Sequence, residues 1–345
     1  MRLTGKWRSV VVRGCVTACL VIAAPSPGWA HGDTGSGARG GGPLEVPAVR
    51  DFIGEMVRRH RFEAHALEAL FAGAKFSDRV VEAFSRPAEA KPWRSYRKLF
   101  LTSRRIRNGA AFMSANRSIL ERASRQFGVP PEILTAIIGV ESSYGEHRSR
   151  LRVLDSLATL AFRVPRRAAF FRGELEAFLL LCREERMDPS EVRGSYAGAI
   201  GMAQFIPSSY RAYAVDYDGD GRRDLRGSIA DAVGSVANYL GRHRWRNGGP
   251  VAVAVVGVAA GDPRLARRGL EPRLRVSDLV RSGVKSLQAA LPGGRVVMFS
   301  LDGESGTEFW LGYRNFYVLT RYNPSKLYAM AVYSLANAIR DFEPS

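Results

Sequence analysis

Cysteine is scarce in this sequence, which excludes disulfides as its main source of stability. The 345 residues contain three cysteines, and two of them, Cys15 and Cys19, lie within the first thirty residues. A chain that loses this N-terminal segment keeps only Cys182, which cannot form an internal disulfide. Its stability must therefore come from a packed core, and we expect Cys182 to be part of that core.

Long apolar runs are also lacking, so no segment is expected to stay in a membrane as a spanning helix. A short apolar run at 14–24 follows a basic start and precedes Ala30, which is typical of a secretory signal peptide over residues 1–30. The sequence therefore predicts export to the periplasm. A second interpretation makes Cys19 the acylated first residue of an outer-membrane lipoprotein, and only this form would be attached to a membrane.

Acidic residues are few compared with basic ones: 33 against 51, for a formal net charge of +18. Such a charge suits a polyanionic environment. The arginines are spread along the chain and no nucleic-acid-binding motif accompanies them, so nucleic acid is not an expected partner. An anionic cell wall fits both the charge and the export signal, although basic residues scattered over a solvated surface would give the same composition.

The chain is predicted to be α+β and predominantly helical. Residues 31–48 are glycine-rich and predict a flexible linker. Apolar residues at a period near 3.6 predict helices through 49–125 and most of 126–247. β-rich segments in 248–308 predict a small mixed subdomain. Within 309–345, the aromatic and β-branched residues up to position 322 predict a strand, and a C-terminal helix follows.

Glu141 is the sharpest candidate for catalysis. Pro130 and Pro131 open a helix that is apolar on nearly every side, and Glu141 stands near its end, where Gly145 is expected to stop it. Loss of water around a carboxyl group disfavours its charged form and would raise its pKa. Such a group could hold a proton near neutral pH and give it to a leaving oxygen. The alternative is a glutamate that only meets solvent or an arginine.

Two glycine-containing segments add further chemistry. Residues 194–207 mix small, polar and aromatic residues, which suits a sugar because its apolar face stacks on rings while its hydroxyls need hydrogen-bond partners; a tight structural turn is the alternative. Residues 216–222 place an acid at every second position and then a glycine, like the first half of an EF-hand calcium loop. Gly227 stands where the closing glutamate is expected, so closure would fall to Asp231; a solvated acidic turn is the alternative.

These segments, in this order, resemble the membrane-bound lytic murein transglycosylase B family. The resemblance begins near residue 49 and covers most of the chain from there. The matching segments are 128–133, 138–141, 157–162, 166–167 with Phe171 and 174–175, 194–210, 213–216, 235–239, 315–317 and 322–323. The resemblance implies a lysozyme-like catalytic core, flanked by a helical part and a small β-containing subdomain.

The resemblance also implies roles for individual residues. Glu141 would be the sole catalytic carboxylate. Residues that would bind the substrate are Tyr96, Arg166, Arg167, Ser195, Gln204, Phe205, Tyr239, Tyr322, Asn323 and Tyr328, with the two arginines meeting the peptide stem. A structural Ca2+ would be held in an EF-hand-like loop at 216–231 by Asp216, Asp218, Asp220, Asp231 and the backbone of Arg222. No cofactor is expected to take part in catalysis.

The function implied by this resemblance is cleavage of peptidoglycan glycan strands between N-acetylmuramic acid and N-acetylglucosamine, with a 1,6-anhydromuramyl product. Two alternatives stay open: a hydrolytic muramidase, which delivers water to the same bond, and a catalytically inactive wall-binding protein. We expect a monomer, and other cell-wall enzymes are candidate partners.

Overall fold

A computed structural model describes residues 42–85, 91–147, 149–259, 261–265, 269–287 and 290–343. The expected signal peptide, Cys19 and most of the predicted linker lie outside these residues. The last part of the predicted linker is helical, because the 3-10 turn η1 spans Pro43–Glu45 and α1 (Pro47–His60) begins before residue 49. Pro47 suits a first helical turn, where its missing N–H costs nothing.

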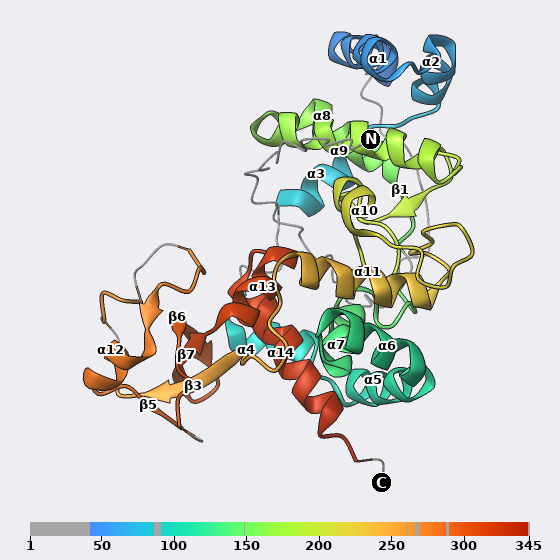
Figure 1. The fold of residues 1–345 in the computed structure, drawn as a ribbon. Coiled ribbons are helices and arrows are strands. Elements are labelled where there is room, and N and C mark those ends of the chain that lie inside the picture. The colour runs from blue at the N-terminus through green and yellow to red at the C-terminus, as the bar shows by residue number, and fades with distance from the viewer. Residues whose placement is uncertain are drawn as a thin grey trace, which may run out of the picture.

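Helices dominate the described chain and pack in pairs that are often distant in sequence, such as α7 with α14 and α6 with α11 (Figure 1). The predominantly helical α+β prediction is confirmed. No helix in the described ranges combines the length and hydrophobicity needed to cross a membrane. Besides α1, the helices are α2 (Ala64–Ala72), α3 (Asp78–Ser85), α4 (Trp93–Tyr96), α5 (Ser103–Ala115), α6 (Arg117–Phe127), α7 (Pro131–Ser142), α8 (Val153–Arg163), α9 (Ala168–Glu184), α10 (Pro207–Tyr213), α11 (Ile229–Arg242), α12 (Val276–Arg281), α13 (Arg314–Tyr322) and α14 (Lys326–Arg340).

The helix α7 lies at the centre of the core, packed against α5, α6, α11 and α14. Every residue from Ile133 to Val140 is buried, which confirms the all-round apolar helix predicted from the sequence. The helix ends differently from the prediction. Ser143 adopts the left-handed conformation (φ 51°) and terminates α7 two residues before Gly145.

The segment after α7 folds back onto its own helix through Tyr144. A Cβ atom added at Gly139 would lie 2.6 Å from the Tyr144 ring, so only glycine leaves room for this ring. The Tyr144 hydroxyl also donates a hydrogen bond to the Arg105 carbonyl of α5 at 2.8 Å. These contacts fix the path of the chain directly beyond Glu141.

A five-stranded antiparallel sheet stands beside the helical body in the order β4-β6-β7-β3-β5 (Figure 1). Its strands are β3 (Ala252–Val256), β4 (Leu274–Arg275), β5 (Lys285–Ser286), β6 (Arg295–Gly303) and β7 (Gly306–Gly312). The strand predicted up to residue 322 is wrong beyond β7, because α13 begins at Arg314. Phe316 and Leu319, three positions apart, are both buried, so packing favours a helix over the strand that their composition suggested.

Candidate active site

Glu141 lies in the last turn of α7 and is half-buried, between the buried Val140 and Ser142. The Tyr328 hydroxyl donates a hydrogen bond to Glu141 Oε1 at 2.7 Å. Tyr328 is fully buried in the first turn of α14, where the Ser325 side chain caps the helix by accepting from the Tyr328 N–H. This cap begins the helix so that Tyr328 places its phenol directly against the carboxylate.

Aromatic rings form a continuous cluster from this phenol outward. The Tyr322 and Tyr328 rings are stacked with centroids 6.3 Å apart. Tyr239 lies 4.9 Å from Tyr322, and Phe205 lies 5.6 Å from each of these two rings. Burial, and then the nearby charge of Glu141, raise the pKa of Tyr322 and of Tyr328 well above the usual value. Both hydroxyls therefore stay protonated and can donate a hydrogen bond, as Tyr328 does to Glu141.

The tight turn at 195–205 lies against this cluster, because the Tyr322 hydroxyl donates to the Ala203 carbonyl at 2.6 Å. The Ser195 Oγ accepts a hydrogen bond from the Ala199 N–H at 3.0 Å. Gln204 is left-handed (φ 48°), and its side-chain amide donates to the Gly201 carbonyl at 2.8 Å. This small-residue segment is therefore a structural turn, and within it Gln204 directly precedes the ring residue Phe205.

The other predicted substrate residues occupy different surroundings. Tyr96 is fully buried in α4, with its ring 5.2 Å from Phe100, and Asn323 is buried at the end of α13. Arg166 is exposed in the turn η4 (Pro165–Arg167) between α8 and α9, and the guanidinium of Arg167 lies over an aromatic ring at 5.3 Å. Of the predicted substrate residues, Tyr328 donates directly to Glu141, whereas Tyr96 and Asn323 are buried.

The acidic loop at 216–231 brings three carboxylates together. Side-chain oxygens of Asp216, Asp218 and Asp231 lie within 4.8 Å of one another. Asp231 is fully buried, and its two oxygens accept from the backbone N–H groups of Tyr217 at 2.6 Å and of Asp224 at 2.7 Å. Burial raises the pKa of Asp231, so a nearby positive charge would favour its ionised form. Three carboxylates in such a turn fit a hard cation such as Ca2+.

Asp220 does not belong to this group of oxygens. Its carboxylate instead accepts from the Arg222 N–H at 2.8 Å. Gly227 stands where an EF-hand has its last ligand, and Asp231 lies four residues further on. Because α11 begins at Ile229, Asp231 lies in the first turn of this helix and its side chain reaches back to the loop. The predicted closure by Asp231 thus has a structural basis, while the predicted ligand role of Asp220 has none in these contacts.

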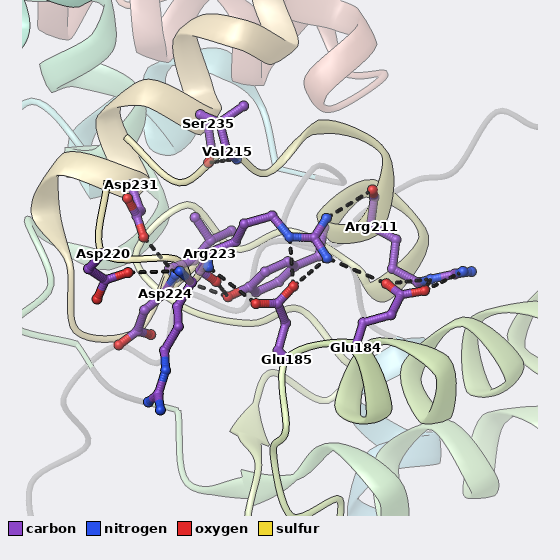
Figure 2. Close-up of polar contacts among 12 residues, drawn as sticks. Glu184, Glu185, Arg211, Val215, Asp220, Arg223, Asp224, Asp231 and Ser235 are labelled. Atoms are coloured by element: carbon purple, nitrogen blue, oxygen red, sulfur yellow. Dashed lines mark hydrogen bonds and ion pairs between the residues drawn. The ribbon is translucent and has the colours of Figure 1, made fainter. Parts of the chain in front are cut away.

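An ion-pair network that the sequence did not predict anchors this loop to the end of α9 (Figure 2). The Arg223 Nε donates to Glu185 at 2.6 Å, and Arg211 pairs with Glu184 at 2.7 Å. The partners lie 27 and 38 residues apart in the chain, so no local pattern could reveal them.

A hydrogen-bond path joins the cation loop to the turn beside Glu141. The buried Tyr210 hydroxyl accepts from the Leu225 N–H at 3.0 Å and donates to the Arg223 carbonyl. The Leu225 carbonyl in turn accepts from the Met202 N–H at 2.7 Å. The loop and the turn therefore share one backbone framework.

The model of the transglycosylase SLT domain family matches residues 45–337. The chain belongs to this family. It is 41% identical over 310 residues to the membrane-bound lytic murein transglycosylase B of Escherichia coli K12, covering 87% of this chain and 84% of that protein. The resemblance inferred from the sequence is thereby confirmed.

Solved structures of SLT-family proteins agree with this fold. The Escherichia coli lytic transglycosylase Slt35 in complex with calcium is 41% identical, with a TM-score of 0.79 and coverage of 85% of this chain and 93% of that one. SltB3 from Pseudomonas aeruginosa, in complex with NAG-anhNAM-pentapeptide, is 33% identical, with a TM-score of 0.77 and coverage of 88% and 80%. The fold is therefore that of the lytic transglycosylases.

Proposed function

We propose that this chain is a peptidoglycan lytic transglycosylase in which Glu141 acts as both acid and base. The observation that carries the proposal is a half-buried carboxyl group at the end of a buried helix, hydrogen-bonded to Tyr328 and bordered by a cluster of rings. Rings and hydrogen-bonding groups side by side are what a sugar site requires. The anhydromuramyl fragment bound to SltB3 supports the product class.

The reaction needs one carboxyl group. Glu141 gives its proton to the oxygen between N-acetylmuramic acid and N-acetylglucosamine, and the bond from this oxygen to C1 of the muramyl unit breaks. The acetamido oxygen of the muramyl unit stabilises the positive charge that develops at C1. The Glu141 carboxylate then takes the proton of the C6 hydroxyl, whose oxygen bonds to C1 and closes the 1,6-anhydro ring.

The surroundings of Glu141 support this single-carboxylate scheme. Among the residues that the structure describes, the fully buried carboxylates besides this site are Glu174 and Asp231. Ser208 holds Glu174 through its N–H and hydroxyl, and backbone amides hold Asp231 in the cation loop. Neither is placed to act as the second catalytic carboxylate of an ordinary glycosidase. The Tyr328 hydroxyl donates to Oε1 of Glu141 and so orients the carboxyl group that exchanges the proton with the sugar.

Digestion of purified peptidoglycan, followed by mass spectrometry, tests the proposal. The anhydro product lacks one water compared with the product of a hydrolytic muramidase, so the two activities separate by mass. Glu141→Gln is expected to lower the rate by at least about 10²-fold. Glu132→Gln is the matched control, because Glu132 lies in the first turn of the same helix. Reducing ends as the main product would support the muramidase, and an inactive wild-type protein would support a wall-binding role.

The proposed cation is a structural Ca2+ held by Asp216, Asp218 and Asp231. Bound there, it would supply positive charge that stabilises the clustered carboxylates, and it would take no part in the reaction. The calcium complex of Slt35 supports this choice of ion. Calorimetric titration of metal-free protein with Ca2+ tests it, and an absence of binding heat would contradict it.

We further propose that the chain acts in the periplasm as a monomer on glycan strands. The predicted signal at residues 1–30 supports export. The mass of the mature protein distinguishes the two forms, since cleavage after Ala30 gives an unmodified chain and acylation gives a lipid-bearing Cys19. Detection of the full-length, unprocessed chain in the cytoplasm would contradict this proposal.

A further inference from the structure

A cavity of about 290 Å3 adjoins the candidate active site. Its wall includes Ser142, the neighbour of Glu141, as well as Gly194, the neighbour of Ser195. Gln204 also lines it, so three segments of the candidate site contribute to the same hollow. A molecule in this cavity would therefore lie next to a sugar bound at Glu141.

Two arginines from distant parts of the chain lie in the cavity wall. Arg193 lies in β2 (Arg193–Gly194), which pairs with β1 (Leu151–Arg152), and Arg226 lies in the acidic loop at 216–231. Their side chains are 48% and 46% exposed. The fold thus directs two permanent positive charges toward one solvent-accessible space.

The present partners of these guanidinium groups are loose. Arg193 lies 3.8 Å from Glu191 and donates to the Arg150 carbonyl at 3.5 Å, and Arg226 lies 3.9 Å from Asp224. Close N–O pairs of a guanidinium and a carboxylate are normally near 2.7–2.9 Å. Arg223 makes such a close pair with Glu185, with its Nε donating at 2.6 Å. By this comparison, the two cavity arginines keep donors that a bound anion could use.

We propose that this cavity binds a carboxylate of the peptide stem carried by the muramyl unit, in addition to the stem contact that the resemblance implies for Arg166 and Arg167. The proposal rests on the proposed function, since the stem is attached to the sugar whose bond is cleaved. A guanidinium group binds a carboxylate through two parallel N–H donors, which suits a peptide carboxylate better than an uncharged sugar hydroxyl. Glu191 belongs to the same wall and reduces its positive charge, but it is 71% exposed and free to turn toward solvent when the stem enters.

Two glycan substrates test the proposal: strands that carry peptide stems, and the same strands after the stems are removed with an amidase. The double variant Arg193→Ala/Arg226→Ala is expected to raise KM about tenfold for stem-bearing strands, with little change in kcat. For stripped strands its KM should equal that of the wild type. Arg125→Ala is the matched control, because Arg125 has a similarly long 3.8 Å ion pair with Glu121 on α6, outside the cavity.

Equal changes on both substrates, or no change on either, would overturn the proposal. Binding of a stem-bearing disaccharide and of its stem-free counterpart to Glu141→Gln, measured by calorimetry, gives a readout that does not depend on turnover. The stem should tighten binding, and the double substitution should remove that gain. If wild-type protein yields no anhydro product but the stem still tightens binding through the two arginines, the proposed reaction fails and the stem site stands. Competition by inorganic phosphate but not by free stem peptide would identify a general anion site and overturn the proposal.

Discussion

Replacement of Tyr328 by phenylalanine tests how Glu141 is held ready for proton transfer. The variant keeps the buried ring and its stacking on Tyr322, but it removes the hydroxyl that donates to Glu141 Oε1 at 2.7 Å. A hydrogen bond to a charged group contributes about 1.5–3 kcal/mol, and about 1.4 kcal/mol corresponds to a tenfold change in rate. Because Glu141 is half-buried, water can replace part of the lost donor. We therefore expect kcat to fall about tenfold.

The pH dependence of the same variant gives a second test. The pKa of Tyr328 is well above its usual value because of burial and the charge of Glu141, so its hydroxyl keeps its proton across the working pH range. It therefore stabilises the carboxylate form of Glu141 throughout. Its loss should move the alkaline fall in activity, where the acid form of Glu141 is depleted, to higher pH.

Initial rates on stem-bearing glycan strands, measured from mildly acidic to alkaline pH, would show both effects of the Tyr328 substitution. Tyr333→Phe on the same helix is the control, and thermal unfolding confirms that both variants are folded. An unchanged rate together with an unchanged alkaline limb would refute the role assigned to the Tyr328 hydroxyl.

Three further predictions concern stability. Gly139→Ala should lower the free energy of unfolding by about 1–3 kcal/mol, because the added Cβ would lie 2.6 Å from a tyrosine ring. Gly173→Ala, in an open part of α9, should raise the free energy of unfolding by about 0.5–1 kcal/mol. Urea unfolding measures both changes. Ca2+ should raise the melting temperature of the wild type, and Asp231→Asn should remove most of this rise, as followed by circular dichroism. Burial raises the pKa of Glu174, so the ionised carboxylate destabilises the folded state above that pKa, and this destabilisation disappears as pH falls. Ser208→Ala removes a hydroxyl that donates to this carboxylate, and it should therefore lower the free energy of unfolding by about 1–3 kcal/mol near neutral pH and by less at about pH 4. Urea unfolding at both pH values measures the difference.

Local sequence signals predicted the elements whose causes are themselves local. Proline at the start of α7 acts within one helical turn, and the helix begins there as expected. The strand expected up to residue 322 failed because aromatic and β-branched composition reports packing more than backbone preference. In α13 the burial of Phe316 and Leu319 on one helical face outweighs that composition.

The contacts that would make Glu141 catalytic could not be read from local patterns. Tyr328 lies 187 residues after Glu141, and only the family resemblance pointed to it. The long ion pairs of Arg193 and Arg226 could not be predicted from the sequence either. The distance from each arginine to a carboxylate depends on where the fold places the acidic residues.

The acidic loop at 216–231 also depends on contacts between distant residues. These contacts connect the loop to the turn beside the candidate active site, although the loop is not part of that site. The Asp231 carboxylate accepts a hydrogen bond from the Asp224 N–H. The carbonyl of the next residue, Leu225, accepts from the Met202 N–H, and Met202 lies in the same turn as Gln204 and Phe205. A backbone shift in the loop must therefore move the turn, because Gly201 already lies so close to Leu225 that an added Cβ would be 2.3 Å from its carbonyl oxygen. Packing this tight transmits displacement instead of absorbing it. Gly201 and the acidic loop thus act together to fix the position of the turn beside the ring cluster.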